Sequence, residues 1–200
     1  MGFPERLAIA TRNPHKLREL GRICADWPVT WMTAETSEGP WPDVEEPHET
    51  YAENALVKAR EVAAVLGVPA IADDSGIEVD ALGGAPGPRS ARFAGEDATD
   101  AENLTKLLVE IAGTEPVART ARYRCVAAVA WPEGTGLVAE GTCEGTLVSE
   151  PRGTGGFGYD PAFVPVGEDR TMAELTDEEK DSISHRGRAF RALRARLADR

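Results

Sequence analysis

The chain has 200 residues, of which 34 are acidic and 22 are Lys or Arg, and its net charge is −12. This balance argues against a protein that binds duplex nucleic acid, because such proteins normally present a basic surface. No apolar run approaches the ~20 residues of a membrane span. Cys24, Cys125 and Cys143 are too widely spaced to suggest a disulfide framework or a zinc site. The composition therefore predicts a single cytoplasmic domain over residues 1–200, with buried thiols and no membrane or nucleic-acid partner.

The first third of the chain alternates strands and helices. The hydrophobic pattern predicts, in order, a strand over 7–10, a helix over 15–25, a strand over 27–34 and a helix that starts after Thr50 and ends at Gly67. Thr50 and Glu53 have the spacing of a capping box. Residues 35–49, between the second strand and the second helix, are acidic and rich in Pro and Gly. They predict a loop long enough to suggest a function.

A short apolar run over residues 70–72 leads into two adjacent carboxylates, Asp73 and Asp74, followed by Ser75 and a glycine. Two neighbouring ionised carboxylates at the end of a buried strand repel each other unless a cation or solvent compensates them. Mg²⁺ meets this requirement, because it binds one or two carboxylates together with waters and phosphate oxygens. The same residue types also favour a solvated turn. The motif alone leaves both interpretations open.

The rest of the chain predicts an α/β protein. In order, the pattern predicts an irregular segment over 82–93, a helix capped at Thr99 and running to about 112, antiparallel strands over 121–131 and 136–148, a glycine loop over 153–161 and a C-terminal helix that opens at Thr176. One face of this last helix would hold Ile183, Phe190, Leu193 and Leu197. The mixture of strands and helices indicates a mixed sheet.

Three polar segments could bind a nucleotide. Lys16 follows a polar turn at a helix start, where backbone N–H groups and an ammonium attract phosphate. The same sequence pattern is also typical of an ordinary capped helix. The glycine loop presents Phe157 and Tyr159, which could stack on a planar base or pack in the core. On the C-terminal helix, His185 and Arg186 could donate hydrogen bonds to a keto oxygen or lie at the surface.

Seven short motifs follow one another along the chain. They are Thr-x-Asn-x-x-Lys (11–16), Glu-Asn-Ala-x-x-Lys-Ala (53–59), Ala-Asp-Asp-Ser-Gly (72–76), Gly-Gly-Ala-Pro-Gly (83–87), Ser-Ala-Arg-Phe (90–93), Gly-Thr-Gly-Gly-Phe-Gly-Tyr-Asp-Pro (153–161) and Ser-His-Arg-Gly (184–187). In this order, from Ile9 to about Leu197, they resemble the inosine triphosphate pyrophosphatase family, also called Ham1-like, whose members hydrolyse non-canonical purine nucleoside triphosphates.

The resemblance implies an elongated mixed β-sheet flanked by helices, with two lobes and a central nucleotide cleft, and assembly as a homodimer. It implies that Asp74 is the general base that activates water, and that Glu46, Asp73 and Asp74 hold Mg²⁺. The substrate-binding residues that it implies are Thr11, Arg12, Asn13, Pro14, His15, Lys16, Ser75, Phe157, Gly158, Tyr159, Asp160, Lys180, His185 and Arg186.

The function implied is Mg²⁺-dependent hydrolysis of the purine nucleoside triphosphates ITP, dITP and XTP to the monophosphate and pyrophosphate, which cleanses the nucleotide pool. Two departures from the family pattern are visible. Arg12 stands where glycine is frequent, and residues 47–49 replace a turn that usually contains Thr-Gly. The second departure leaves Glu45 and Glu49 as alternatives to Glu46 for the metal ligand.

Three other functions fit parts of the pattern. A Maf-like pyrophosphatase acting on pyrimidine or modified nucleotides shares the general architecture, but the motif over 184–187 speaks against it. A nucleotide-sensing module without hydrolysis would not need two adjacent carboxylates. A serine hydrolase that uses Ser75 as nucleophile and His185 as base would lack the Gly-x-Ser-x-Gly turn that exposes such a serine.

Overall fold

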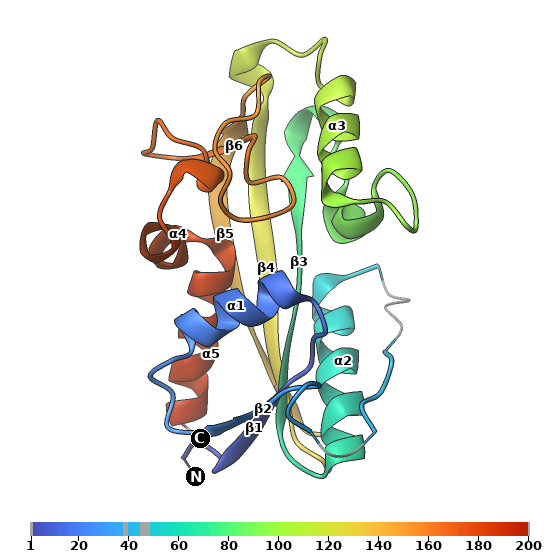
Figure 1. Cartoon of the computed structure of the whole chain (residues 1–200), viewed down its shortest axis with the longest axis vertical. Helices are drawn as coiled ribbons and strands as arrows, with labels where there is room; N and C mark the ends of the chain where they lie inside the picture. Colours follow the sequence, from blue (N-terminus) through green and yellow to red (C-terminus); the bar gives the residue numbers. More distant parts are fainter. Residues whose placement is uncertain (1, 38–39, 45–48, 200) are drawn as a thin grey trace. The chain divides into compact units, whose positions relative to one another are not determined.

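The computed structural model describes residues 2–37, 40–44 and 49–199, and these residues form a six-stranded sheet with helices around it (Figure 1). The strands are β1 (Arg6–Ile9), β2 (Thr30–Met32), β3 (Ala70–Val79), β4 (Thr120–Ala130), β5 (Gly136–Leu147) and β6 (Phe163–Pro165). Their order in the sheet is β2-β1-β3-β4-β5-β6. β1 runs parallel to β2 and β3, whereas β5 and β6 are antiparallel. The predicted α/β class with a mixed sheet is confirmed.

The α-helices are α1 (Pro14–Ile23), α2 (Tyr51–Leu66), α3 (Asp100–Glu110), α4 (Asp177–Ile183) and α5 (His185–Ala198). The predicted caps of α2 are confirmed: Thr50 Oγ1 accepts a hydrogen bond from the N–H of Glu53 at 3.3 Å, and Gly67 ends the helix with a φ of 65°. Thr99 and Glu102 form the predicted capping box of α3. Within the described part of the chain, the structure has no helix long and apolar enough to cross a membrane.

The chain divides into two compact units. Unit 1 comprises residues 1–74, 125–141 and 186–200, and unit 2 comprises residues 75–124 and 142–185. Strands β3, β4 and β5 contribute residues to both units. In unit 1, helices α1 and α5 pack on one face of the strands and α2 packs on the other. In unit 2, α3 packs on strands β3 to β6 through an apolar cluster around Ile77, Leu107 and Phe163.

Alternation along β3 divides its side chains between the two faces of unit 1. Ile71 belongs to the apolar cluster that includes α1 and α5, whereas Ala70 and Ala72 belong to the cluster that includes α2. Successive side chains of a strand point to opposite faces of its sheet. Asp73 therefore faces α1 and α5, and Asp74 faces α2.

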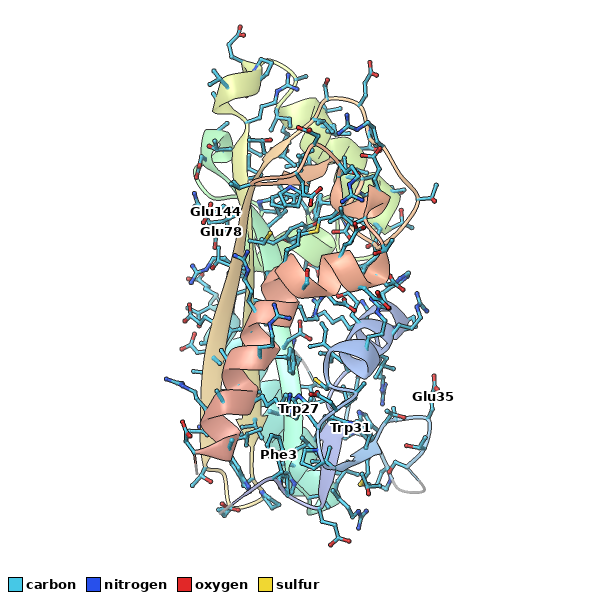
Figure 2. All side chains as sticks on the ribbon, turned by 90° about the vertical axis from the view of Figure 1, so that its left-hand side faces the viewer. Phe3, Trp27, Trp31, Glu35, Glu78 and Glu144 are labelled. Carbon is cyan, nitrogen blue, oxygen red and sulfur yellow. The ribbon has the colours of Figure 1, made fainter. Side chains whose placement is uncertain are left out.

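A cluster of aromatic rings lies in unit 1 and includes one ring from α5. Figure 2 shows Phe3, Trp27 and Trp31 close together. The ring centroids of Phe3 and Trp27 are 5.4 Å apart, and those of Trp27 and Trp31 are 5.8 Å apart. The tilted ring of Phe190 from α5 lies 6.4 Å from Trp27. These contacts fix the helix that carries Arg186 at its start against the strands of the same unit.

The three cysteines are buried and carry free thiols, as the sequence predicts. Burial raises the pKa of Cys24 and of Cys125 well above the usual value for a thiol, and the neighbouring carboxylates Asp26 and Asp73 add to the effect. Both thiols therefore stay protonated at neutral pH.

The carboxylate pair lies inside a strand, which corrects the expectation that the strand ends there and excludes a turn. β3 continues through Asp73, Asp74 and Ser75 to Val79. Both aspartates are nearly inaccessible, with exposed fractions of 2% and 4%. A strand can bury two adjacent carboxylates when their side chains point to opposite faces and each meets its own cation.

The predicted C-terminal helix is two helices. Ser184 has an extended conformation, with φ of −64° and ψ of 154°, and separates α4 from α5. Serine favours the position directly before a helix, because its side chain can accept from the first free N–H groups. The apolar face predicted for Ile183, Phe190, Leu193 and Leu197 is therefore divided between α4 and α5.

Candidate active site

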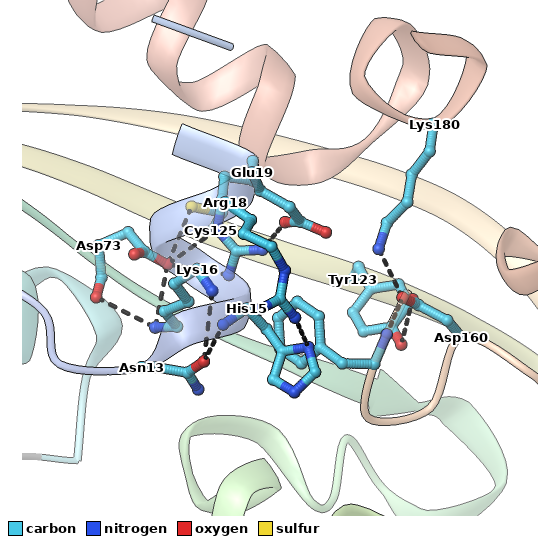
Figure 3. A network of polar contacts seen from close by, with 12 residues as sticks. Asn13, His15, Lys16, Arg18, Glu19, Asp73, Tyr123, Cys125, Asp160 and Lys180 are labelled. Atoms are coloured by element: carbon cyan, nitrogen blue, oxygen red, sulfur yellow. Dashed lines mark hydrogen bonds and ion pairs between the residues drawn. The ribbon is translucent and has the colours of Figure 1, made fainter. Parts of the chain in front are cut away.

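The side chain of Asp73 is the centre of a buried polar network in unit 1 (Figure 3). Its Oδ2 atom lies 3.1 Å from Nζ of Lys16, on α1, and accepts a hydrogen bond of 3.0 Å from Nη2 of Arg186, on α5. Arg186 is 1% exposed, which excludes the surface position that the sequence left open as one of two alternatives. The two cations reach Asp73 because α1 and α5 pack on the same face of β3.

Asp73 is ionised in this network. Burial alone raises the pKa of its carboxyl, but the charges of Lys16 and Arg186 outweigh that effect and hold the pKa well below its usual range. Burial likewise disfavours the Arg186 cation, whereas Asp73 and Glu19 raise the pKa of its guanidinium above the usual value. Both partners therefore keep their charges at neutral pH.

Glu19 completes the network and is a residue that the sequence reasoning missed. It is 5% exposed, and its Oε2 accepts a hydrogen bond of 2.5 Å from Nη1 of Arg186. Glu19 lies three residues after Lys16, so both side chains share one face of α1. That spacing was a visible signal, but the partner, Arg186, is 167 positions away in the sequence.

Asp74 contacts a separate pair of residues on α2. Nδ2 of Asn54 donates a hydrogen bond of 3.0 Å to Oδ2 of Asp74, and Nζ of Lys58 lies 3.6 Å from Oδ1. Asn54 and Lys58 are four residues apart and so lie on the same face of the helix. Both residues belong to the motif over 53–59, and neither was predicted to be a site residue.

The loop before α1 uses its polar groups to start the helix. Oδ1 of Asn13 accepts hydrogen bonds from the N–H groups of His15 and Lys16, at 2.9 and 3.2 Å, and Pro14 is the first helical residue. Thr11 Oγ1 accepts from the N–H of Asn13 at 3.2 Å. The structure therefore shows the ordinary capped helix, with Lys16 pointing to Asp73, and phosphate binding at this helix start stays a prediction.

Two further contacts tie this loop to its surroundings. Nη2 of Arg12 donates to the backbone oxygen of Trp41 at 2.9 Å and Nη1 lies 3.5 Å from Asp43, so the arginine links the loop to the acidic segment. Nη2 of Arg18 is 2.8 Å from Nδ1 of His15 (Figure 3). These groups give the start of α1 a positive character.

Unit 2 holds a second buried network around Asp160. Nζ of Lys180 lies 2.5 Å from Oδ2 of Asp160, the hydroxyl of Tyr123 donates to Oδ1 at 3.1 Å, and the N–H of Phe157 donates to Oδ2 at 2.9 Å. Asp160 and Lys180 are 3% and 4% exposed. The Lys180 ammonium also lies 5.3 Å from the centre of the Phe157 ring. This network joins the glycine loop to α4.

The aromatic residues of the glycine loop differ in their environment. Tyr159 is buried in the core of unit 2, where its hydroxyl donates to the backbone oxygen of Ser90 at 2.7 Å. Phe157 is only partly buried. The N–H of Gly158 donates to Asp100 at 3.0 Å. Of the two aromatic rings, Phe157 is therefore the one with exposed surface to offer a base.

His185 lies in unit 2 at the start of α5, and it is buried, contrary to a surface position. Its ring stacks on Tyr123 with centroids 4.5 Å apart and an interplanar angle of 8°. Tyr123 thus contacts both His185 and Asp160 and places the histidine beside the Lys180 network. Ser75 lies in β3 and is half-buried.

The proposed metal ligands are only partly described. Glu46 and its alternative Glu45 lie outside the described residues, and Glu49 is exposed. Among the residues with described positions, no group of three or more His, Cys, Asp or Glu could hold a metal ion. The buried Asp74 carboxylate fits Mg²⁺, which binds through one or two protein carboxylates and completes its shell with water and phosphate oxygens.

Comparisons with known proteins agree on one family. A profile of the Ham1 family matches residues 7–196. A relative named dITP/XTP pyrophosphatase from Streptomyces coelicolor is 53% identical over 189 residues, which are 94% of each chain. Another of that name from Escherichia coli O157:H7 is 48% identical over 94% of this chain and 96% of the relative.

Solved structures give the same result. The HAM1 protein from Coxiella burnetii superposes with a TM-score of 0.86 at 40% identity, covering 98% of this chain and all of the other. A nucleoside-triphosphatase and dITP/XTP pyrophosphatase from Mycobacterium abscessus has a TM-score of 0.75 at 42% identity, covering 94% of this chain and 98% of that one. With the motifs, the fold and the relatives in agreement over nearly its whole length, the chain belongs to the Ham1 family.

Proposed function

We propose that this chain is a Mg²⁺-dependent enzyme that hydrolyses dITP, XTP and ITP between the α and β phosphates, releasing the monophosphate and pyrophosphate. Its class, nucleoside triphosphate pyrophosphatase, follows from membership of the Ham1 family and from relatives named for that activity. ITP joins the substrates because it carries the same base as dITP. The proposed homodimer and cytoplasmic location rest on the resemblance and composition alone.

The observation that carries the proposal is the arrangement of Asp74. A buried carboxylate with one oxygen hydrogen-bonded to Asn54 and the other near Lys58 is held in a fixed orientation. Such a carboxylate can accept the proton of a water that attacks phosphorus. In this role Asn54 orients the base, and the Lys58 ammonium lies beside its other oxygen.

The metal would be held by Asp74, with Glu46 proposed as a second ligand. Mg²⁺ bound there would lower the pKa of a water and neutralise charge on the phosphates. The chain's own residues do the remaining work. The Lys16 ammonium attracts the phosphate oxygens, and Arg12 adds positive charge to that loop.

Selection of the base is proposed to depend on Lys180, His185, Arg186 and the segment 157–160. Keto purines carry an acceptor at the 6-position where adenine carries an amino donor. Buried donors left unpaired by adenine would cost binding energy in the transition state, so the enzyme would favour hypoxanthine and xanthine. Ser75, next to Asp74 in the chain, is proposed to contact the substrate and not to act as a nucleophile.

A panel of nucleotides tests the function. The pure protein is incubated with dITP, XTP, ITP, dATP, dGTP, dCTP and dTTP, with and without Mg²⁺, and released pyrophosphate and orthophosphate are measured separately. We expect Mg²⁺-dependent pyrophosphate from the hypoxanthine and xanthine nucleotides. Preference for a pyrimidine would support a Maf-like activity, and tight binding without hydrolysis would support a sensing module.

A further inference from the structure

We propose that Asp73 is a positioning residue, which holds Lys16 and Arg186 through one carboxylate oxygen, and that it is not a ligand of the metal. The inference rests on the proposed function, because it assigns how the phosphate-binding lysine and the arginine of the base-reading set are held. It also departs from the expectation that Asp73 and Asp74 bind Mg²⁺ together.

The Oδ2 atom of Asp73 already has several donors around it. This oxygen receives Nη2 and Nε of Arg186 at 3.0 and 3.3 Å and lies 3.1 Å from Nζ of Lys16, with Sγ of Cys125 at 3.9 Å (Figure 3). A carboxylate oxygen offers about two lone pairs. Two full cations therefore use the capacity that a metal ion would need at this atom.

The charges around Asp73 also disfavour a metal ion there. Asp73 and Glu19 face Lys16 and Arg186, so two anions already balance two cations in a buried place. A divalent cation at Asp73 would lie against an ammonium and a guanidinium in a medium of low dielectric, where repulsion is strong. At Asp74, by contrast, the Lys58 ammonium is 3.6 Å away, farther than Lys16 and Arg186 are from Asp73.

The geometry of β3 also separates the two carboxylates. Asp73 and Asp74 are consecutive in β3, so their side chains point to opposite faces, one to α1 and α5 and the other to α2. Two carboxylates arranged in this way cannot both bind one ion directly. The metal thus belongs to the face of Asp74, and Asp73 serves the face of α1 and α5.

A shared anchor has a functional consequence. Lys16 and Arg186 come from different helices, and the Asp73 oxygen is the atom that both contact. Displacing one of them changes the charge that holds the other. Phosphate binding through Lys16 and base selection through Arg186 should therefore be energetically coupled through Asp73.

Metal binding by the free protein separates the two roles, with Mn²⁺ as a spectroscopic probe. Free Mn²⁺ is titrated by electron paramagnetic resonance against the wild type, Asp73→Asn and the matched neighbour Asp74→Asn. Independent sites change each other's binding little, so we expect the dissociation constant of Asp73→Asn to stay within about two-fold of wild type. Asp74→Asn, which loses a ligand, should weaken binding by about ten-fold or more. Equal weakening in the two variants would overturn the proposal.

Kinetics test the positioning role. The ratio of kcat/KM for dITP to that for dATP should fall by about ten-fold in Asp73→Asn, because Arg186 loses one of the two carboxylates that hold it. A merely structural role would lower stability and leave this ratio unchanged for the folded protein. An unchanged ratio would therefore also overturn the proposal.

A second variant decides the matter if Asp73→Asn does not fold. Lys16→Gln removes one of the two cations on Asp73, and Arg12→Gln removes a cation of the same loop that contacts Trp41 and Asp43 instead. With coupling through Asp73, Lys16→Gln lowers the dITP to dATP ratio as well as kcat/KM, whereas Arg12→Gln affects both nucleotides equally. Equal loss for both nucleotides in Lys16→Gln would contradict the coupling.

These results are distinguishable from failure of the proposed function. If the wild type releases no pyrophosphate from any nucleotide of the panel, the function is wrong, whatever Mn²⁺ does. If the wild type is active and Asp73→Asn loses Mn²⁺ as Asp74→Asn does, the function stands and the role given to Asp73 fails.

Discussion

Nζ of Lys180 lies 2.5 Å from Oδ2 of Asp160, and both side chains are almost completely buried. The same carboxylate accepts from the N–H of Phe157 and the hydroxyl of Tyr123, so its two oxygens serve three donors. One ion pair thereby fixes the glycine loop, α4 and β4 to one another within unit 2. Of the residues proposed to read the base, Lys180 and Phe157 contact this carboxylate directly.

Breaking this pair should be costly. Asp160→Asn leaves the Lys180 ammonium buried without its counter-charge, which typically costs about 3–5 kcal/mol. We expect a large fall in the free energy of unfolding, measured by urea denaturation. The double variant Asp160→Asn with Lys180→Met removes the buried charge as well, and it should recover much of the loss. A double variant as unstable as the single one would contradict this explanation.

Two glycines of the loop provide a matched pair. A Cβ at Gly156 would lie 2.1 Å from Oδ2 of Asp160 and 2.9 Å from Nζ of Lys180, whereas a Cβ at Gly158 would meet nothing within 4 Å. Both have a positive φ, of 68° and 62°. Gly158→Ala should therefore cost only about 1–2 kcal/mol of backbone strain.

Gly156→Ala introduces the same backbone strain and also displaces the ion pair. We expect its melting temperature to fall well below that of Gly158→Ala and its KM for dITP to rise. The measurement is calorimetry of both variants beside steady-state kinetics. Equal melting temperatures would mean that the Asp160–Lys180 pair tolerates a methyl group beside it.

Asn54 should act through Asp74 and not through the fold alone. Asn54→Leu removes the donor to Oδ2 of Asp74, and we expect kcat to fall by about ten-fold or more as the base loses its orientation. Asn103→Leu is the control. Its side chain is equally buried and bonds the backbone of Ala94 and Ala91 in unit 2.

Both asparagine variants should lose stability, by about 1–3 kcal/mol for the unpaired backbone or carboxylate groups they leave. Only Asn54→Leu should lose turnover per folded molecule. Equal kcat losses in the two variants would mean that Asn54 is a structural residue.

The carboxyl group of Asp73 should make the free energy of unfolding depend on pH in acid. Its pKa in the folded protein lies well below the usual value of 3.8, because Lys16 and Arg186 outweigh the effect of burial. The unfolded chain therefore binds this proton at higher pH than the folded one. The stabilisation is fully present above the usual pKa and is lost as the pH falls below it.

The measurement is urea unfolding at several pH values from 6 to 3. Below a pH of about 4, the wild type should lose up to about 1.4 kcal/mol per pH unit more than Asp73→Asn, which has no such proton to bind. Parallel profiles for the two proteins would show that the carboxyl is not held ionised.

The sequence predicted the parts of the fold that depend on nearby residues. Thr50, Gly67 and Thr99 mark helix ends because their contacts lie within four positions of themselves. The break at Ser184 was missed because apolar spacing continues on both sides of it, so periodicity alone favours one helix. Only the extended backbone of this one residue divides α4 from α5.

The site was predicted less completely, because burial and partners are set by tertiary contacts. The sequence indicated that Asp73 and Asp74 need cations, but it could not show that Lys16 and Arg186 serve one and Lys58 the other. The alternation of side chains along β3 assigns each carboxylate to its own cations. Because the strand was expected to end at the carboxylates, this alternation was not predicted. Glu19 and Asn54 were missed because their partners are distant in sequence.

The most direct test of the account is the turnover of Asp74→Asn with dITP and Mg²⁺. This change keeps the shape of the side chain and removes the proton acceptor. The account predicts a folded protein whose kcat at saturating dITP and Mg²⁺ is lowered by at least about 100-fold, the loss typical of a missing general base. Pyrophosphate release near the wild-type rate would contradict the central claim that Asp74 activates the water.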